Sequence, residues 1–270
     1  MIRPLFFLLL AFVVTADLAA QQRLPGNKNI YGATGRGVIY DNELNFMMAL
    51  STPRNLTVGV RSGKLLSFDR MRYWSASFGD LRHGRERKEN RNDVNLATNR
   101  VSRSYVFGKQ NQLYALRVGF GQRKYLSEKA RQRGVAVGYS YEFGPTIGLL
   151  KPYYLEIKSS EVNNPGLIRE IRYEGDNENL FLNQDRIFGA AAWTLGLDEI
   201  QLRPGVHAQV AGHFGFGAYD EMSKILEAGI AADFLFGNTD IFVESELTPG
   251  VKNSPLFLHL FINVQLGKRW

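Results

Sequence analysis

The end of the chain alternates apolar and mixed side chains without a break. Apolar side chains occupy every second position, at Leu256, Leu258, Leu260, Ile262, Val264 and Leu266. The positions between them hold Phe257, His259, Phe261, Asn263, Gln265 and Gly267. In a β-strand these two sets face opposite sides of a sheet. The stripe continues to Lys268 and Trp270, so the chain is predicted to end in a strand with one apolar face and an aromatic last residue.

The beginning of the chain has the pattern of an export signal. Arg3 supplies a positive charge, residues 5–14 are an unbroken apolar run, and Ala16, Ala19 and Ala20 follow. We expect a secretory signal peptide over residues 1–20, cleaved after Ala20, and a periplasmic segment over residues 21–35. The alternative is an amino-terminal membrane anchor, which is disfavoured because the run is short for about 30 Å of hydrocarbon.

Composition narrows the classes of site and partner. The chain has no cysteine, which excludes disulfides, thiolate metal ligands and lipid attachment through a cysteine. No later stretch approaches the length of a membrane-spanning helix. The formal net charge is +7, which alone is compatible with nucleic acid. For an exported chain, anionic lipid headgroups or acidic envelope proteins are better partners, and no nucleic-acid partner is predicted.

The same alternation recurs along the rest of the chain. Residues 135–143 place Val135, Val137, Tyr139, Tyr141 and Phe143 opposite Ala136, Gly138, Ser140 and Glu142. A water-soluble antiparallel sheet would show this alternation with the faces exchanged. We favour the membrane interpretation because the second face is too charged for a soluble core, where unpaired charge is costly to bury.

We predict about twelve strands, and ten or fourteen would need one merged or missed pair. They lie near residues 36–50, 55–68, 70–82, 99–109, 111–123, 133–143, 148–158, 186–197, 200–216, 223–236, 239–247 and 255–268. Predicted connections after odd strands include the long ones at 82–99, 124–133 and 158–185, whereas those after even strands are short. This alternation predicts an even strand count with long loops outside and both termini in the periplasm.

The apolar outer face, mixed inner face, terminal aromatic residue and export signal together resemble a bacterial outer-membrane β-barrel. The resemblance covers the mature chain and implies an all-β fold, a closed antiparallel transmembrane barrel over residues 36–270. It also implies insertion by the barrel-assembly machinery, which recognises a carboxyl-terminal strand with a final aromatic residue. The residues that match that assembly signal are Leu260, Ile262, Val264, Leu266 and Trp270.

Basic residues gather in two of the predicted outside loops. They are Arg82, Arg85, Arg87, Lys88 and Arg91 in the first loop, and Lys124 and Arg131 in the second. Arginine suits bidentate contacts with phosphate or carboxylate groups. One hypothesis is that these loops bind the lipid A phosphates of lipopolysaccharide or an acidic envelope protein. The other is that they are solvated loops whose charge matches an anionic leaflet.

The predicted inward face carries charges of both signs. Its members are Arg61, Arg117, Glu142, Arg203, His207, His213, Glu227, Asp233, Glu244 and His259. One interpretation is a polar passage for a solute, and the one we favour is an ion-paired network that fills a narrow lumen. His207, His213 and His259 could also face one another near Glu244, as general-base chemistry or a metal would require.

No catalytic motif accompanies these histidines. Outer-membrane lipid hydrolases place a serine two residues after a histidine, but here Arg85, Gln209, Gly215 and Phe261 follow the four histidines at that spacing. We therefore predict no catalytic residue, cofactor or metal. The leading hypothesis is a non-enzymatic barrel that is a structural or accessory subunit of an insertion or secretion complex. The alternatives are a small-solute channel and, more weakly, a lipid- or glycan-acting surface enzyme.

Overall fold

The computed structural model describes residues 40–67, 69–90, 94–95, 100–126, 135–158, 167–216 and 222–270. The predicted signal peptide and the segment at 21–35 lie outside these residues. Among the described residues, no helix is long and apolar enough to cross a membrane.

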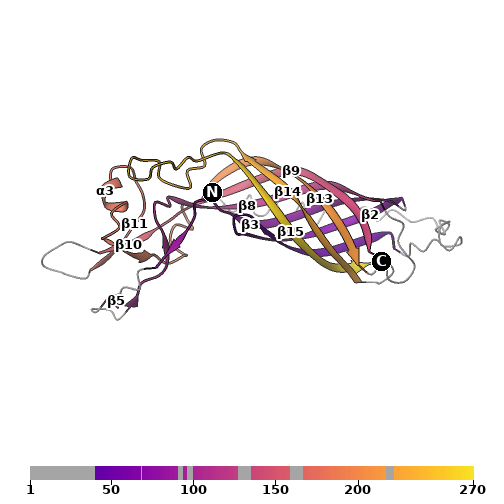
Figure 1. Ribbon diagram of the computed structural model, residues 1–270, viewed down its shortest axis with the longest axis horizontal. Coiled ribbons are helices and arrows are strands. Elements are labelled where there is room, and N and C mark those ends of the chain that lie inside the picture. The colour runs from indigo at the N-terminus through magenta and orange to yellow at the C-terminus, as the bar shows by residue number, and fades with distance from the viewer. Residues whose placement is uncertain are drawn as a thin grey trace. The chain divides into compact units, whose positions relative to one another are not determined.

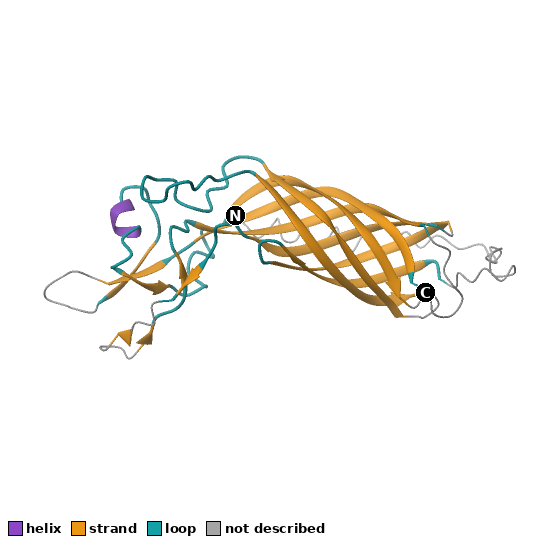
Figure 2. Ribbon diagram, viewed as in Figure 1, coloured by secondary structure: helices purple, strands orange, loops and turns teal. Residues whose placement is uncertain are grey.

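Eight long strands close into one antiparallel barrel (Figures 1 and 2). They are β1 (Asn42–Ser51), β2 (Asn55–Ser67), β3 (Arg70–Leu81), β8 (Asn111–Tyr125), β9 (Ala136–Pro152), β13 (Gln201–Phe216), β14 (Met222–Leu235) and β15 (Leu256–Arg269). Each barrel strand pairs with the one before it in the chain, and β15 pairs with β1 to close the ring. The prediction of about twelve strands is therefore wrong, because the barrel has eight.

The seam between the first and last strands is continuous in register. Glu43 pairs with Arg269 at one end of the seam and Ser51 with Phe261 at the other. The backbone N–H groups of Asp41 and Asn42 both donate to the carbonyl oxygen of Trp270, at 2.9 and 2.8 Å. The strand at the end of the chain thus leaves no open sheet edge.

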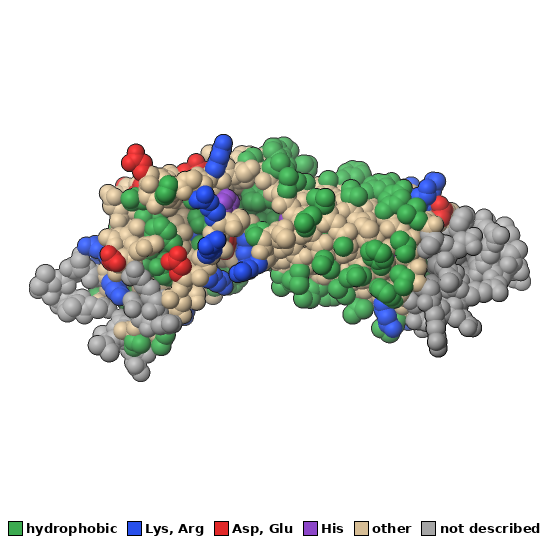
Figure 3. All heavy atoms as spheres, in the orientation of Figure 1, with side chains coloured by type: hydrophobic (Ala, Val, Ile, Leu, Met, Phe, Trp, Pro, Cys, Tyr) green, Lys and Arg blue, Asp and Glu red, His purple; other side chains and the backbone are tan. Residues whose placement is uncertain are grey.

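Side chains alternate between the two faces of every barrel strand. On β15, Leu258, Leu260, Ile262 and Leu266 are exposed, whereas Phe261, Asn263 and Gln265 between them are buried. Figure 3 shows the consequence on one face of the barrel: hydrophobic side chains cover the wall, and Lys and Arg side chains appear at its margins. An apolar outer wall around a polar interior is the pattern of a barrel whose solvent is lipid.

Two predicted strands, 133–143 and 148–158, are largely one continuous strand, β9. The short connection predicted between these two strands includes Gly144, Pro145 and Thr146, which instead continue the strand and pair with β13. On the other side, the ladder between β8 and β9 is interrupted opposite Gly144 and Pro145. Proline adopts extended backbone and only removes one donor, so a local interruption of one ladder accommodates it without ending the strand.

Three other predicted strands lie in the connections. We call the described residues within 82–110, 153–200 and 236–255 the outside unit. Within it β4 (Lys88–Glu89) pairs with β7 (Tyr105–Val106), and β5 (Val94–Asn95) with β6 (Arg100–Val101). β10 (Leu155–Lys158) lies between β11 (Ile168–Ile171) and β12 (Ile187–Ala190), with the short helix α3 (Glu178–Phe181) nearby in sequence. The predicted strands at 99–109, 186–197 and 239–247 therefore belong to this unit and not to the barrel wall.

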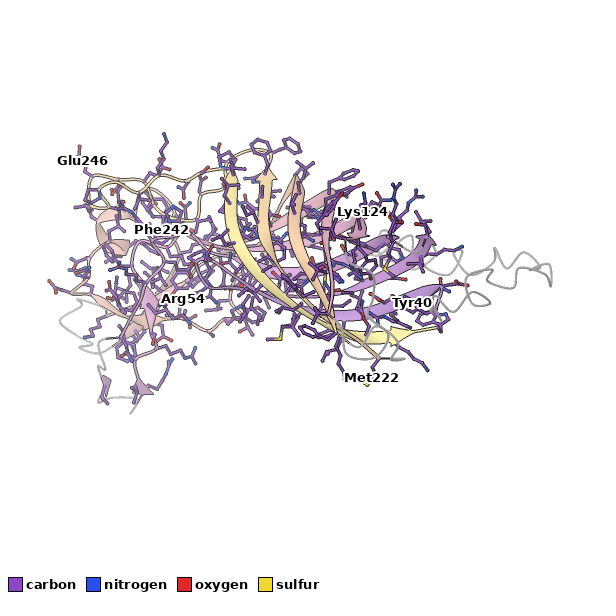
Figure 4. All side chains as sticks on the ribbon, turned by 45° about the vertical axis from the view of Figure 1, so that its right-hand side comes forward. Tyr40, Arg54, Lys124, Met222, Phe242 and Glu246 are labelled. Carbon is purple, nitrogen blue, oxygen red and sulfur yellow. The ribbon has the colours of Figure 1, made fainter. Side chains whose placement is uncertain are left out.

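The connections differ sharply between the two ends of the barrel. The three long connections and the short one at 52–54 emerge at one end, which we call the long-connection end. The described residues that flank the other connections, Asp69, Leu126, Val135, Phe216 and Met222, lie at the other end, which also carries Tyr40 and Trp270 and which we call the terminus end. Figure 4 places Lys124 at the same end as Tyr40 and Met222. The prediction that 124–133 is an outside loop beside 82–99 is therefore wrong.

Candidate functional site

The centre of the barrel is an ion-paired cluster. Arg61 on β2 donates through Nη1 to Glu227 Oε2 on β14 at 2.8 Å and through Nη2 to Glu142 Oε2 on β9 at 3.0 Å. All three side chains are at most 4 % exposed. Because the three strands lie on different sides of the barrel, these two contacts cross the lumen and fill it at this level.

A second set of contacts lies toward the terminus end. Arg123 on β8 contacts Glu43 at 3.0 Å and Glu227 at 3.4 Å, and Arg269 donates through Nε to Glu43 Oε2 at 2.8 Å. Gln265 Nε2 adds a hydrogen bond of 2.6 Å to Glu227. Arg123, Glu43 and Arg269 are not among the predicted lumen residues, although the period of two from Arg117 along β8 places Arg123 on the same inward face.

A third ion pair lies toward the long-connection end. Arg117 on β8 makes a bidentate contact with Asp233 on β14, with distances of 2.6 and 2.9 Å. Both side chains are buried, and His259 Nε2 lies 3.8 Å from Asp233 Oδ2. We call the charged members of the three levels the lumen network. They are Glu43, Arg61, Arg117, Arg123, Glu142, Glu227, Asp233 and Arg269.

The lumen network leaves little free volume. One cavity of about 40 Å³ lies among Arg117, Glu142, His207 and Asp233. A buried water needs about 10–15 Å³ of such volume, so the cavity holds a few waters and no larger solute. Beyond it, an apolar cluster that includes Leu81, Leu113, Leu235 and Phe242 packs where the barrel meets the outside unit.

The histidines do not face one another. His213 Nδ1 lies 3.2 Å from Glu227, His207 Nε2 lies 3.4 Å from Glu142, and His259 is near Asp233. Each imidazole therefore joins a different carboxylate of the network. Among the described residues there is no group of three or more side chains placed to hold a metal ion.

One of these contacts has the order of a catalytic triad. Thr146 Oγ1 lies 3.1 Å from His207 Nδ1, and His207 Nε2 faces Glu142. A hydroxyl, an imidazole and a carboxylate in this order form a nucleophile with its base. Here the Thr146 side chain is buried, the adjoining cavity has no room for a substrate, and Glu142 is already paired with Arg61. The arrangement fits a structural network better than a reacting centre.

Two residues predicted for the lumen lie elsewhere. Glu244 is exposed in the connection between β14 and β15, where its Oε1 accepts a hydrogen bond from the backbone of Asn253 at 2.6 Å. Arg203 shares the inward register of β13 but lies near the rim, where it donates to the carbonyl oxygen of Asn238 and to Gln201. The prediction failed for Glu244 because residues 239–247 are not a barrel strand.

The predicted anion-binding residues are divided between the two ends. At the long-connection end Arg82 pairs with Asp80 at 2.6 Å and Arg85 donates to the carbonyl oxygen of Pro249 at 2.9 Å. Arg87 and Lys88 are exposed at the same end. Lys124 lies at the terminus end, so it cannot act with them. Arg91 and Arg131 lie outside the described residues.

The outside unit has its own apolar core. Tyr105, Leu155, Phe181, Ile187 and Val243 come from its three connections and are buried together. At its base Lys109 Nζ pairs with Glu86 Oε1, and both side chains are less than 10 % exposed. Burial lowers the pKa of the Lys109 ammonium group, while Glu86 acts in the opposite direction. The three connections are therefore one packed unit rather than separate loops.

The residues of the predicted assembly signal lie on the outer wall. Leu260, Ile262, Val264 and Leu266 are exposed along β15, and Trp270 follows at its end. This places them where they contact lipid if the barrel spans a membrane.

Comparisons with known proteins identify no family for this chain. No family model and no curated protein matches the chain. Among solved structures, one that matches is the crystal structure of Ail, the attachment invasion locus protein of Yersinia pestis, in complex with the heparin analogue sucrose octasulfate. It covers 86 % of this chain and 99 % of its own, with 9 % identity and a TM-score of 0.39. By its own strand order, outer wall and lumen, the chain is a closed eight-stranded antiparallel barrel with an apolar exterior and a charged, filled interior.

Proposed function

We propose that the protein is a non-enzymatic outer-membrane anchor that holds a folded unit at the cell surface, as a structural or accessory subunit of an envelope complex. The observation that carries the proposal is the lumen network, which crosses the barrel at three levels and leaves a cavity of about 40 Å³. A barrel filled in this way is suited to support rather than to transport.

The outer wall of the barrel and the lengths of its connections support a location in the outer membrane. Apolar side chains face outward on all eight strands, as lipid requires. In bacterial outer-membrane barrels the short turns face the periplasm and the long loops face outside. We therefore place the terminus end in the periplasm and the outside unit at the cell surface, after export directed by residues 1–20.

The packed core and the charged surface of the outside unit support a protein partner. Its core of Tyr105, Leu155, Phe181 and Ile187 holds the three connections in one shape, which reduces the entropy lost when a partner binds. Its surface carries acidic residues such as Glu170 and Glu174 and basic residues such as Arg87, so its contacts depend on charge pattern. The favoured partner is another envelope protein.

Affinity purification tests this part of the proposal. The full chain, tagged at the terminus end, is cross-linked in native membranes and purified in a mild detergent. We expect a defined partner that is lost when Glu170 and Glu174 are both changed to Gln, and is kept when Lys64 and Lys224 at the other end are changed to Gln. A monomer under every cross-linking condition would contradict the proposal.

A second candidate function is a small-solute channel. A cavity of about 300 Å³ lies beside the short connection between β1 and β2, with Pro53, Arg82, His83 and His259 among its lining residues. His259 also lines the 40 Å³ cavity of the lumen, so this side chain borders both spaces. Planar-bilayer recording separates the functions: a stable unitary conductance of the wild-type protein favours the channel, and silence favours the anchor.

The basic residues Arg85, Arg87 and Lys88 of the outside unit remain a proposed site for lipid A phosphates. Arg87 and Lys88 are exposed, and Arg85 is held by the Pro249 carbonyl group near them. Changing Arg85, Arg87 and Arg91 together to Gln is expected to reduce co-purified lipopolysaccharide. Equal amounts in the variant and the wild type would leave these residues as solvated loop positions.

A further inference from the structure

Basic side chains gather on the outer surface of the barrel at its terminus end. They occupy outward positions on five strands: Lys64 on β2, Arg70 and Arg72 on β3, Lys124 on β8, Lys224 on β14 and Lys268 on β15. Four of them, Lys64, Arg70, Arg72 and Lys124, lie on three adjacent strands, and we call these four the basic patch. Figure 4 labels Lys124 at this end of the barrel.

The basic patch contains two pairs of like charges that face each other across strands. Lys64 is directly opposite Arg72 in the ladder of β2 and β3, and Arg70 is directly opposite Lys124 in the ladder of β3 and β8. Like charges in this position repel and destabilise a sheet. Within the described residues, the one ion pair of the patch joins Arg70 to Asp69 at 3.6 Å. Among the described residues, these four cations and the Asp69 carboxylate carry a net charge of +3, which anions at this level of the barrel would offset.

The aromatic side chains beside the basic patch indicate the depth at which the patch lies in the membrane. Trp74 is the next outward residue after Arg72 on β3 and is exposed. Tyr139 is directly opposite Lys124 on β9, and Tyr141 next along that face donates to Gln122 at 2.6 Å. Trp and Tyr on a barrel wall lie at the boundary between hydrocarbon and headgroups. The cations just beyond them therefore lie at the level of the headgroup phosphates.

The other end of the same three strands lacks such cations on its outward face. There β3 presents Asp80, and β8 presents Gln112 and Tyr114. The cations of the basic patch follow directly after the apolar and aromatic outward residues of the same strands. This position favours a lipid headgroup over a soluble protein, which would have to enter the headgroup layer to reach them.

We propose that the basic patch binds the phosphates of anionic glycerophospholipids in the leaflet around the terminus end. The proposal goes beyond the proposed anchoring function and rests on its membrane location. The lysine and arginine groups donate charge-assisted hydrogen bonds to phosphate oxygens, and the bound phosphates relieve the repulsion between the like-charge pairs. The ligand is the phosphate diester of phosphatidylglycerol or of diphosphatidylglycerol.

The test measures lipid selectivity of the full chain. The purified protein is placed in nanodiscs of phosphatidylcholine with a minor fraction of phosphatidylglycerol, diphosphatidylglycerol or lipopolysaccharide, and retained lipids are counted by native mass spectrometry. The wild type is expected to retain either anionic glycerophospholipid over phosphatidylcholine. In the variant Lys64→Gln, Arg72→Gln, Lys124→Gln this preference is expected to fall about fivefold for each cation removed at low salt.

A matched variant removes the same charge from the other end. Arg103→Gln, Arg169→Gln, Lys252→Gln changes three exposed cations of the outside unit and is expected to keep the preference. The charge-conserving variant Lys64→Arg, Arg72→Lys, Lys124→Arg should also keep it. If the Gln variant does not fold, the lipid preference of the wild type is measured at increasing salt concentration. The proposal requires that the preference falls, because salt screens the charges of the basic patch.

Three results would overturn the proposal: no preference in the wild type, an equal loss in the matched variant, or selective loss of lipopolysaccharide in the patch variant. Failure of the anchoring function is distinguishable, because the protein would then not insert into nanodiscs as a folded barrel, as read by its heat-dependent gel mobility.

Discussion

Glu227 accepts two hydrogen bonds from one guanidinium nitrogen of Arg61, at 2.9 and 2.8 Å, in the middle of the barrel. The same carboxylate also accepts from Gln265 and Asn263. The side chains of Arg61 and Glu227 are 2 % and 1 % exposed, so neither has water to replace a lost partner. Glu227 is thus the acceptor on which the lumen network converges.

Glu227→Gln is expected to destabilise the barrel by about 3–5 kcal/mol, because it leaves the buried charges of Arg61 and Arg123 without a carboxylate that both contact. The free energy of unfolding is measured by urea titration of the protein in lipid vesicles. Glu244→Gln is the matched control: Glu244 is exposed in the outside unit, so a change within about 0.5 kcal/mol is expected. Equal effects of the two substitutions would show that the network does not hold the barrel.

Removing one ion pair from the lumen is expected to create a conducting gap. The double variant Arg61→Ala, Glu142→Ala takes away a cation and an anion that span the lumen, so the net charge is unchanged. Planar-bilayer recording should show a larger conductance for this variant than for the wild type. Arg82→Ala, Asp80→Ala removes a pair outside the lumen and serves as control. Identical traces for all three proteins would show that something other than the network closes the barrel.

Gly267→Ala is expected to weaken the seam between β1 and β15. A Cβ atom at this position would collide with the carbonyl oxygen of Leu44 and with the side chain of Asn45 on β1. Overpacking of this kind costs about 1–3 kcal/mol. Gly84→Ala is the control, because a Cβ atom there meets nothing within 4 Å. The check is the fraction of protein that reaches the folded, heat-modifiable form, and equal fractions would contradict the prediction.

The outside unit is expected to lose stability at high pH through Tyr153. Burial raises the pKa of the Tyr153 phenol from 10.0 to about 12, although the hydrogen bond from the backbone of Val106 acts in the opposite direction. Because the folded-state pKa lies above the unfolded value, the stabilising contribution is complete below pH 10 and is lost as pH rises toward 12. Limited proteolysis of the outside unit across this range measures the loss.

Tyr153→Phe removes the ionisable hydroxyl and should flatten the pH dependence while costing some stability at neutral pH, since the Val106 N–H loses its acceptor. An unchanged steep pH dependence in Tyr153→Phe would assign the transition to another group.

The period-2 pattern correctly predicted which side chains face outward and which face inward on strands whose two faces have different surroundings. It predicted the outward stripe of β15, because alternation depends only on the geometry of the extended backbone. It also placed Arg61, Arg117, Glu142, Glu227 and Asp233 on inward faces, where the structure buries them. It could not name their partners, because each contact joins strands that are far apart in sequence.

The strand count failed for a physical reason. Ile241, Phe242 and Val243 are apolar enough for a membrane strand, but they are buried in packing around the outside unit. Tyr105 and Ile187 contribute to the same kind of core. Apolar alternation records that one face avoids water, and it does not record whether lipid or protein covers that face.

The sequence by itself determined an all-β chain with alternating faces and an aromatic end, because these follow from residue spacing along single strands. Only the tertiary structure decided that eight strands close the barrel, that the long connections pack into one unit, and that Lys124 lies at the opposite end from Arg82. These properties depend on which strands meet across the barrel, and a local pattern carries no information about such distant pairings.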